Sequence, residues 1–192
     1  MQATAWALLA FVVYAITQKK TGDIVTLKDA IALHWATATK VAQAVKAPYF
    51  ALWAAGQAGV ESVWGTKGVA ISGAENNPFG MKGGSWIIGY TPTGAPITKP
   101  GRQVAGPYLE KATGKSYYYR IFPSLEAAYL DLWDLYSNRG PRAYTSNIGL
   151  LLKGDYPGFA GAVLPTYDPT NKDYFSIWMQ RVKTLKDTLG IK

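Results

Sequence analysis

The residue in this chain best suited to acid–base chemistry is Glu61, which closes an apolar run that begins near Phe50 and has the character of a helix. Trp64 and Gly65 follow and stop the helix, so the carboxyl group is expected at a helix end. A carboxyl group held there is partly removed from water, which raises its pKa and keeps it protonated near neutral pH. An ordinary exposed glutamate ahead of a helix-ending glycine fits the same local composition.

Most other acidic residues in the chain are expected to have structural or solvent-facing roles and not catalytic ones. They fall at expected helix starts, on amphipathic helices or in turns: Asp23, Asp29, Glu126, Asp131, Asp134, Asp155, Asp173 and Asp187. Four acids remain, namely Glu61, Glu75, Glu110 and Asp168. Of these, Glu61 alone has bulky apolar neighbours on both sides in sequence, which is the setting of a general acid.

Composition narrows the available chemistry. The 192 residues include no cysteine and one histidine, so disulfides, thiol nucleophiles and zinc sites built on His or Cys are excluded. We therefore expect no metal and no cofactor, and chemistry that rests on carboxylates, hydroxyls, amides or lysine. His34 lies beside an apolar helical stripe, where a structural role is expected.

The net charge of +8, from 20 Lys plus Arg against 12 Asp plus Glu, favours a polyanionic partner. Lys19-Lys20 is the one adjacent basic pair, and the sequence has no recognisable nucleic-acid module, so nucleic acid is not expected as a partner. An anionic membrane surface or cell-wall polymer fits better. A basic surface that only aids solubility is the alternative.

The first 20 residues carry no charge before Lys19, and 18 helical residues span about 27 Å, close to the thickness of a bilayer's hydrocarbon core. We expect residues 1–20 to form a hydrophobic anchor helix, residues 21–27 a linker, and residues 28–192 the functional domain. The protein would then be anchored in a membrane. A buried N-terminal helix of a soluble protein is the alternative.

The elements that position Glu61 follow from periodicity and turn residues. Gly and Pro cluster from Gly65 to Arg120, with strand-like runs at Trp86–Tyr90 and Tyr117–Phe122, which predicts a small lobe of one or two hairpins. The fold class is therefore α+β, mainly α. Helices are predicted at about residues 26–46, 49–62, 124–139, 146–153, 158–164 and 172–189.

Two motifs together carry a family resemblance. Residues 57–65 (QAGVESVWG) and 76–82 (NNPFGMK) resemble the signature of the glucosaminidase domains of glycoside hydrolase family 73. Later features continue the resemblance, which spans roughly residues 28–190: YRIF at 119–122, SLE at 124–126, RAY at 142–144, and the region of Tyr167, Asp168 and Tyr174. The resemblance implies a lysozyme-like helical core with a small β-lobe, and a substrate of peptidoglycan glycan strands.

The resemblance also implies roles for particular residues. Glu61 would be the general acid that protonates the β-1,4 bond between N-acetylglucosamine and N-acetylmuramic acid. Glu110 is the best match for a second carboxylate acting as general base, although an exposed hairpin glutamate is equally compatible. A substrate-assisted route needs no such base. Tyr167 matches a tyrosine near the reacting sugar; it directly precedes Asp168, a departure from the family's usual spacing that makes Tyr174 the alternative.

Further substrate contacts are open to two interpretations. Asn77 can bind sugar hydroxyls or acetamides, or it can close a tight turn. Trp86, Tyr90 and Tyr144 can stack on sugar faces or pack in the core, whereas Phe79 and Trp64 are expected in the core.

The sequence thus favours a membrane-anchored endo-β-N-acetylglucosaminidase, which the resemblance implies would act on the cell wall, in a bacterial envelope or a phage virion. A muramidase or lytic transglycosylase of the same superfamily is the rival enzyme, and a non-catalytic virion or wall-binding protein with this fold is the rival of another class.

Overall fold

The computed structural model describes residues 26–66, 76–110, 114–169 and 171–191. The predicted anchor at residues 1–20, most of the linker and Glu75 lie outside this part of the chain. Among the described helices, none combines the length and the apolar character needed to cross a membrane.

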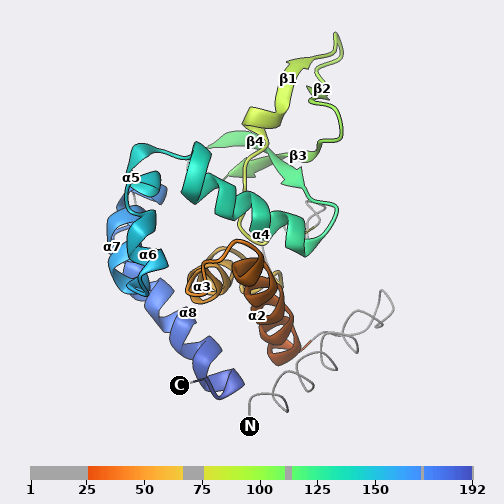
Figure 1. The fold of residues 1–192 in the computed structure, drawn as a ribbon. Helices are drawn as coiled ribbons and strands as arrows, with labels where there is room; N and C mark the ends of the chain where they lie inside the picture. Colours follow the sequence, from red (N-terminus) through yellow and green to blue (C-terminus); the bar gives the residue numbers. More distant parts are fainter. Residues whose placement is uncertain (1–25, 67–75, 111–113, 170, 192) are drawn as a thin grey trace.

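Two helices form the centre of the domain (Figure 1). Helix α2 (Leu27–Ala44) begins at a capping box, in which the Thr26 hydroxyl accepts from the Asp29 backbone while the Asp29 carboxylate accepts from the Thr26 backbone. The sequence predicted this start. Helix α3 (Phe50–Ser62) follows and ends where the chain turns left-handed at Val63. Helix α3 is buried along nearly its whole length, so its end is held firmly against the rest of the domain.

Residues 84–121 form the β-lobe, seen at the top of Figure 1. A single 3-10 turn, η2 (Gly84–Trp86), leads into β1 (Ile87–Tyr90), which pairs antiparallel with β2 (Pro96–Thr98). The second hairpin pairs β3 (Gln103–Glu110) with β4 (Lys115–Ile121), in antiparallel register. Trp86 thus lies in the turn ahead of β1 and not in the strand where the sequence placed it.

The remaining helices, α4 to α8, complete the helical body around α3. Helix α4 (Leu125–Asp134) starts at the predicted cap, where the Ser124 hydroxyl accepts from the Ala127 backbone. It continues as a π-helical turn, η3 (Leu135–Arg139), and ends at Gly140 as expected. Then follow α5 (Arg142–Thr145), α6 (Ile148–Leu152), α7 (Tyr156–Tyr167) and α8 (Tyr174–Leu189).

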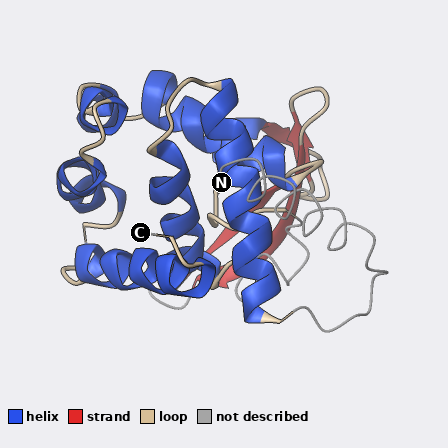
Figure 2. Cartoon of the chain, turned by 60° about the horizontal axis from the view of Figure 1, so that its bottom comes forward, coloured by secondary structure: helices blue, strands red, loops and turns tan. Residues whose placement is uncertain are grey.

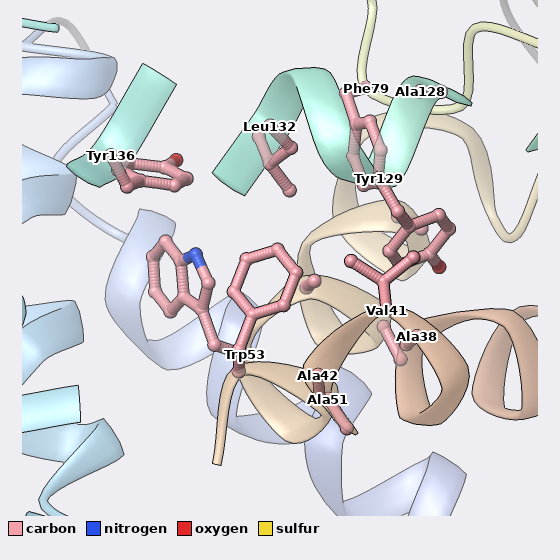
Figure 3. Packing of buried hydrophobic residues seen from close by; sticks show 14 of the residues in the cluster. Ala38, Val41, Ala42, Ala51, Trp53, Phe79, Ala128, Tyr129, Leu132 and Tyr136 are labelled. Atoms are coloured by element: carbon pink, nitrogen blue, oxygen red, sulfur yellow. The ribbon is translucent and has the colours of Figure 1, made fainter. Parts of the chain in front are cut away.

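Aromatic side chains fill the core between these helices (Figure 3). Trp53 of α3 meets the edges of Tyr136 and Phe159 at ring-centroid distances of 5.4 and 5.0 Å. Phe79, from the loop between α3 and η2, enters the core and packs edge-on against Tyr129 of α4, with ring centroids 4.9 Å apart. Phe79 and Trp64 are both buried, as predicted.

The β-lobe is fastened to the helical body through Arg120 of β4. Its guanidinium pairs with Asp131 of α4, and it also donates to the Lys82 carbonyl at 3.1 Å and the Ser85 hydroxyl at 2.8 Å. Asp131 bonds Arg139 as well, at 2.7 Å. The sequence assigned Asp131 to a solvent-facing helix position; instead it is largely buried in this ion-pair cluster.

The α+β, mainly helical fold class is confirmed (Figure 2). The strands lie together at one side of the helical body. Among the described residues they make two separate two-stranded sheets. Glu61 lies in the last turn of the buried helix α3, before the chain passes toward the lobe.

Candidate active site

Glu61 lies in the last turn of α3, where three segments meet. The hydroxyl of Tyr174, at the start of α8, donates a hydrogen bond to Glu61 Oε1. The other carboxyl oxygen faces the loop between α3 and the lobe, because a Cβ added at Gly80 would lie 3.9 Å from Glu61 Oε2. The two oxygens of this carboxyl group therefore have different surroundings.

The pKa of Glu61 is raised to about 7, chiefly because burial penalises the ionised form. The hydrogen bond from Tyr174 works in the opposite direction, and the negative charge of Asp168 adds to the rise. Asp168 closes α7, directly after Tyr167. This is the raised pKa that the apolar neighbourhood in the sequence predicted, and it gives the carboxyl group a substantial protonated fraction near neutral pH.

A buried row of polar groups leads to Glu61 from inside the domain. Tyr136 donates to Gln57 Oε1 at 2.9 Å, and Gln57 Nε2 approaches the Tyr174 hydroxyl at 3.5 Å. Gln57 is fully buried one helical turn before Glu61. Each group in the row donates toward the next, so the row fixes Tyr174 as donor and Glu61 Oε1 as acceptor.

The chain takes an unusual path directly after Glu61. Val63, Trp64 and Gly65 all have left-handed backbones, with φ of 50°, 55° and 75°. A β-branched residue such as valine seldom adopts this conformation, which costs about 1–3 kcal/mol at each such non-glycine position. The turn is held by Trp64, whose buried indole donates to the Ala55 carbonyl at 2.9 Å, and by the Ser62 hydroxyl, which accepts from the Gly65 backbone at 2.8 Å.

Tyr167 also reaches this region, from the end of α7. Its ring lies 5.8 Å from that of Tyr174, and its hydroxyl donates to the Phe79 carbonyl at 3.2 Å. Burial, followed by the charge of Glu61, raises the pKa of Tyr167 well above its usual value. The structure thus brings together Glu61, Tyr167 and Tyr174, three of the residues that the sequence singled out.

Asn77 lies close by but is occupied by the backbone. It is fully buried; its Nδ2 donates to the carbonyls of Met81 and Arg120, both at 3.0 Å, and its Oδ1 accepts from the Met81 backbone at 2.9 Å. These bonds close the loop and tie it to β4. Of the two interpretations of Asn77, the geometry favours the tight turn over sugar binding.

Glu110 stands at the end of β3, in register with Lys115, and forms an ion pair with Lys82 at 2.9 Å. Its side chain is 27% exposed. Burial is the largest cause of the raised pKa of Tyr119 in β4; Glu110 and then Glu61 add to it by their charge. Both carboxylates therefore lie within electrostatic reach of one tyrosine.

The three remaining candidate aromatics are dispersed. Trp86 is buried, with the guanidiniums of Arg102 and Arg120 at 4.7 and 4.8 Å from its ring. Tyr144 is buried against Tyr136 at 5.1 Å. Tyr90 is 58% exposed on β1, beside Tyr118, and of the three it is the one open to a ligand.

Sequence reasoning missed Gln57 as part of this site. Its signal was present, because a residue four positions before Glu61 on a helix shares its face.

Across residues 26–66, 76–110, 114–169 and 171–191, no three His, Asp or Glu side chains gather as a metal site.

Comparisons with known proteins agree with the fold. No family model matches the chain, and no curated protein matches it either. Among solved structures, the chain is similar to the catalytic domain of the autolysin Auto from Listeria monocytogenes, with a TM-score of 0.58, 16% identity and 93% of each chain covered. This likeness shows a shared fold. Membership of the glucosaminidase family stays a prediction.

Proposed function

We propose that this protein is a cell-wall hydrolase that cuts the glycan strands of peptidoglycan, with Glu61 as its general acid. The single observation that carries the proposal is the Glu61 carboxyl group itself, raised in pKa to about 7 and oriented by Tyr174. An acid with a pKa near the working pH is well suited to protonating a leaving group. The shared fold with an autolysin's catalytic domain supports peptidoglycan as the substrate.

In the proposed reaction, Glu61 gives its proton to the bridging oxygen as the bond from the anomeric carbon to that oxygen breaks. Since Oε1 accepts from Tyr174, the proton is carried on Oε2, on the side of Gly80. A water molecule adds to the anomeric carbon and loses a proton to a base. The ionised Glu61 then regains a proton from solvent.

Two described carboxylates are candidates for that base. Glu110 shares the surroundings of Tyr119 with Glu61, whereas Asp168 acts on Glu61 directly through its charge. In a substrate-assisted route the acetamide oxygen of the sugar instead attacks the anomeric carbon as the bond to the bridging oxygen breaks, with Tyr167 or Tyr174 orienting it. Water then opens the cyclic intermediate and gives its proton to the ionised Glu61, so that no second carboxylate is needed. We assign the finer activity as endo-β-N-acetylglucosaminidase, on the resemblance of residues 57–65 and 76–82, and residues 28–192 as the catalytic unit.

The test is digestion of purified sacculi followed by mass spectrometry of the products. Reducing N-acetylglucosamine ends would support the glucosaminidase. Reducing muramic acid ends would indicate a muramidase, and 1,6-anhydromuramic acid a lytic transglycosylase. Sacculi that are bound and left intact would favour a wall-binding protein.

Glu61→Gln should lower the rate by roughly three orders of magnitude or more, because the amide has no acidic proton to give. The matched control is Glu126→Gln at the start of α4, where the glutamate is surface-exposed and paired with Lys40. In the same assay, a large loss for Glu110→Gln or for Asp168→Asn would identify the base, and near-normal turnover of both would favour the acetamide route. Normal turnover by Glu61→Gln would overturn the proposal.

A further inference from the structure

The lone histidine of the chain links α2 to the strained turn that follows Glu61. His34 is 4% exposed, and its Nδ1 lies 2.8 Å from the hydroxyl of Tyr129. The opposite side of the ring faces the turn: Nε2 would lie 3.4 Å from a Cβ added at Gly65, and the Trp64 backbone hydrogen-bonds the imidazole.

These partners fix one state of the ring. Burial lowers the pKa of His34 to about 3, so the imidazole is neutral and has one donor and one acceptor nitrogen. The Trp64 carbonyl accepts the N–H, which leaves Nδ1 to accept from the Tyr129 hydroxyl. Both nitrogens are used, and the tautomer follows from the partners.

The turn that His34 holds needs such support. Val63 and Trp64 are both left-handed without being glycine, so the free chain would relax toward ordinary backbone angles. The turn starts two residues after Glu61. Relaxation would shift the last turn of α3 and with it the carboxyl group.

The second partner of His34 reaches the other segment beside Glu61. The Tyr129 ring packs edge-on against Phe79, the residue before Gly80, whose added Cβ would lie 3.9 Å from Glu61 Oε2. Figure 3 shows Phe79 overlapping α4 in this view, with Tyr129 next to it and lower in the picture. His34 therefore contacts the turn after Glu61 directly, and it reaches the Phe79–Gly80 loop through Tyr129.

We propose that His34 is a positioning residue, whose neutral imidazole clamps the Val63–Gly65 turn and the Phe79–Gly80 loop and so keeps the Glu61 carboxyl oriented and shielded from water. Only the kinetic readout of this inference rests on the proposed hydrolase function. The clamp itself can be tested on the folded protein without any substrate.

The first measurement is the titration of Glu61, followed by carbon-13 NMR of labelled glutamate and assigned with Glu61→Gln. In His34→Leu the turn loses its hydrogen bond, water reaches the carboxyl group, and its pKa should fall by roughly one pH unit or more. His34→Gln keeps a side-chain N–H that can reach the Trp64 carbonyl, and it should restore most of the raised value.

Two further variants separate positioning from stability. Tyr129→Phe removes only the hydroxyl and leaves the ring on Phe79, so the pKa of Glu61 should fall by less than in His34→Leu. If His34→Leu fails to fold, the pKa of Glu61 in Tyr129→Phe tests the proposal in its place. Leu151→Ala removes a fully buried side chain from α6, a helix that contributes no residue to the clamp or to the contacts of Glu61, and should lower stability without moving the titration. An unchanged Glu61 titration in folded His34→Leu, or in Tyr129→Phe where the former does not fold, would overturn the proposal.

The kinetic measurement follows on sacculi. His34→Leu should lose roughly ten- to a hundredfold in kcat with little change in KM, since the acid is misplaced while the rest of the cleft is kept. If the unaltered protein is inactive on all sacculi, the proposed hydrolase function is wrong but the His34 proposal is not affected, because the titration tests the clamp without substrate. A kcat loss in proportion to the unfolded fraction would show that His34 acts only on stability.

Discussion

At the scale of single residues, Tyr174 and burial act on Glu61 in opposite directions. The Tyr174 hydroxyl donates to the carboxylate and favours its ionised form, whereas burial favours the protonated form. Tyr174→Phe should therefore raise the pKa of Glu61 above its present value of about 7. A general acid works only while protonated, so the fall of kcat/KM at alkaline pH should move to higher pH by about one unit.

The control for this measurement is Tyr156→Phe at the start of α7, where the ring packs on Trp178 at 6.1 Å, apart from the Glu61 site. Its pH profile should match that of the unaltered protein. A profile of Tyr174→Phe that moves to lower pH would show that the hydroxyl excludes water more than it stabilises charge.

The sequence singled out Glu61, Tyr167 and Tyr174, but it could not predict which contacts join them or that Gln57 takes part. An apolar helix ending in a glutamate can be read locally, as can the raised pKa that follows. Tyr174 and Gln57 act through contacts that join positions 61, 174 and 57, and only the packing of α8 on α3 brings them together. For Asn77 the sequence left sugar binding open, but in the structure its amide hydrogen-bonds backbone carbonyls.

At the scale of elements, the close contact of α3 with α8 depends on Gly56. A Cβ at this position would lie 2.6 Å from Val182 Cγ2 and 2.8 Å from Trp178 Nε1. Helix propensity alone would favour alanine by about 1 kcal/mol. The clash should outweigh it, because the Trp178 ring is buried, so Gly56→Ala should destabilise the fold by about 1–3 kcal/mol in urea unfolding.

The matched control is Gly161→Ala in α7, where an added Cβ meets nothing within 4 Å. Here the propensity difference acts alone, and stability should stay equal or rise by up to about 1 kcal/mol. Equal changes in stability at the two glycines would show that α8 can shift away from α3 at little cost. Tyr174 would move together with α8.

Helix starts were predicted better than the lobe. Thr26 with Asp29, and Ser124, carry their capping signal within four residues, and both caps are present. Strands β2 and β3 have no comparable local signal, because their residues are fixed by cross-strand pairing. The salt bridge between Arg120 and Asp131 was missed for the same reason: a helix pattern assigns charged positions to solvent unless a partner from another element is known.

At the scale of the whole molecule, the charge of +8 leads us to expect that electrostatic attraction brings the protein to an anionic cell wall. Screening shortens the reach of these charges from about 30 Å at 0.01 M salt to about 8 Å at 0.15 M. Binding of Glu61→Gln to intact sacculi, measured by co-sedimentation, should therefore weaken several-fold over this range.

Sacculi stripped of their anionic polymers provide the control, and their binding should be weaker at low salt and less sensitive to added salt. Salt-independent binding to untreated sacculi would assign recognition to the cleft and leave the net charge a solubility property.

The unequal surroundings of the two Glu61 oxygens also set a direction for the proposed reaction. Tyr174 occupies one oxygen, and beside the other stands Gly80, a residue with no side chain and a φ of 58° that disfavours any replacement. In the proposed reaction we expect the bridging oxygen of the glycan to arrive on the side of that glycine, which would fix the direction of the strand. The proposed cut would then always leave the same end of the polymer on the same side of the protein.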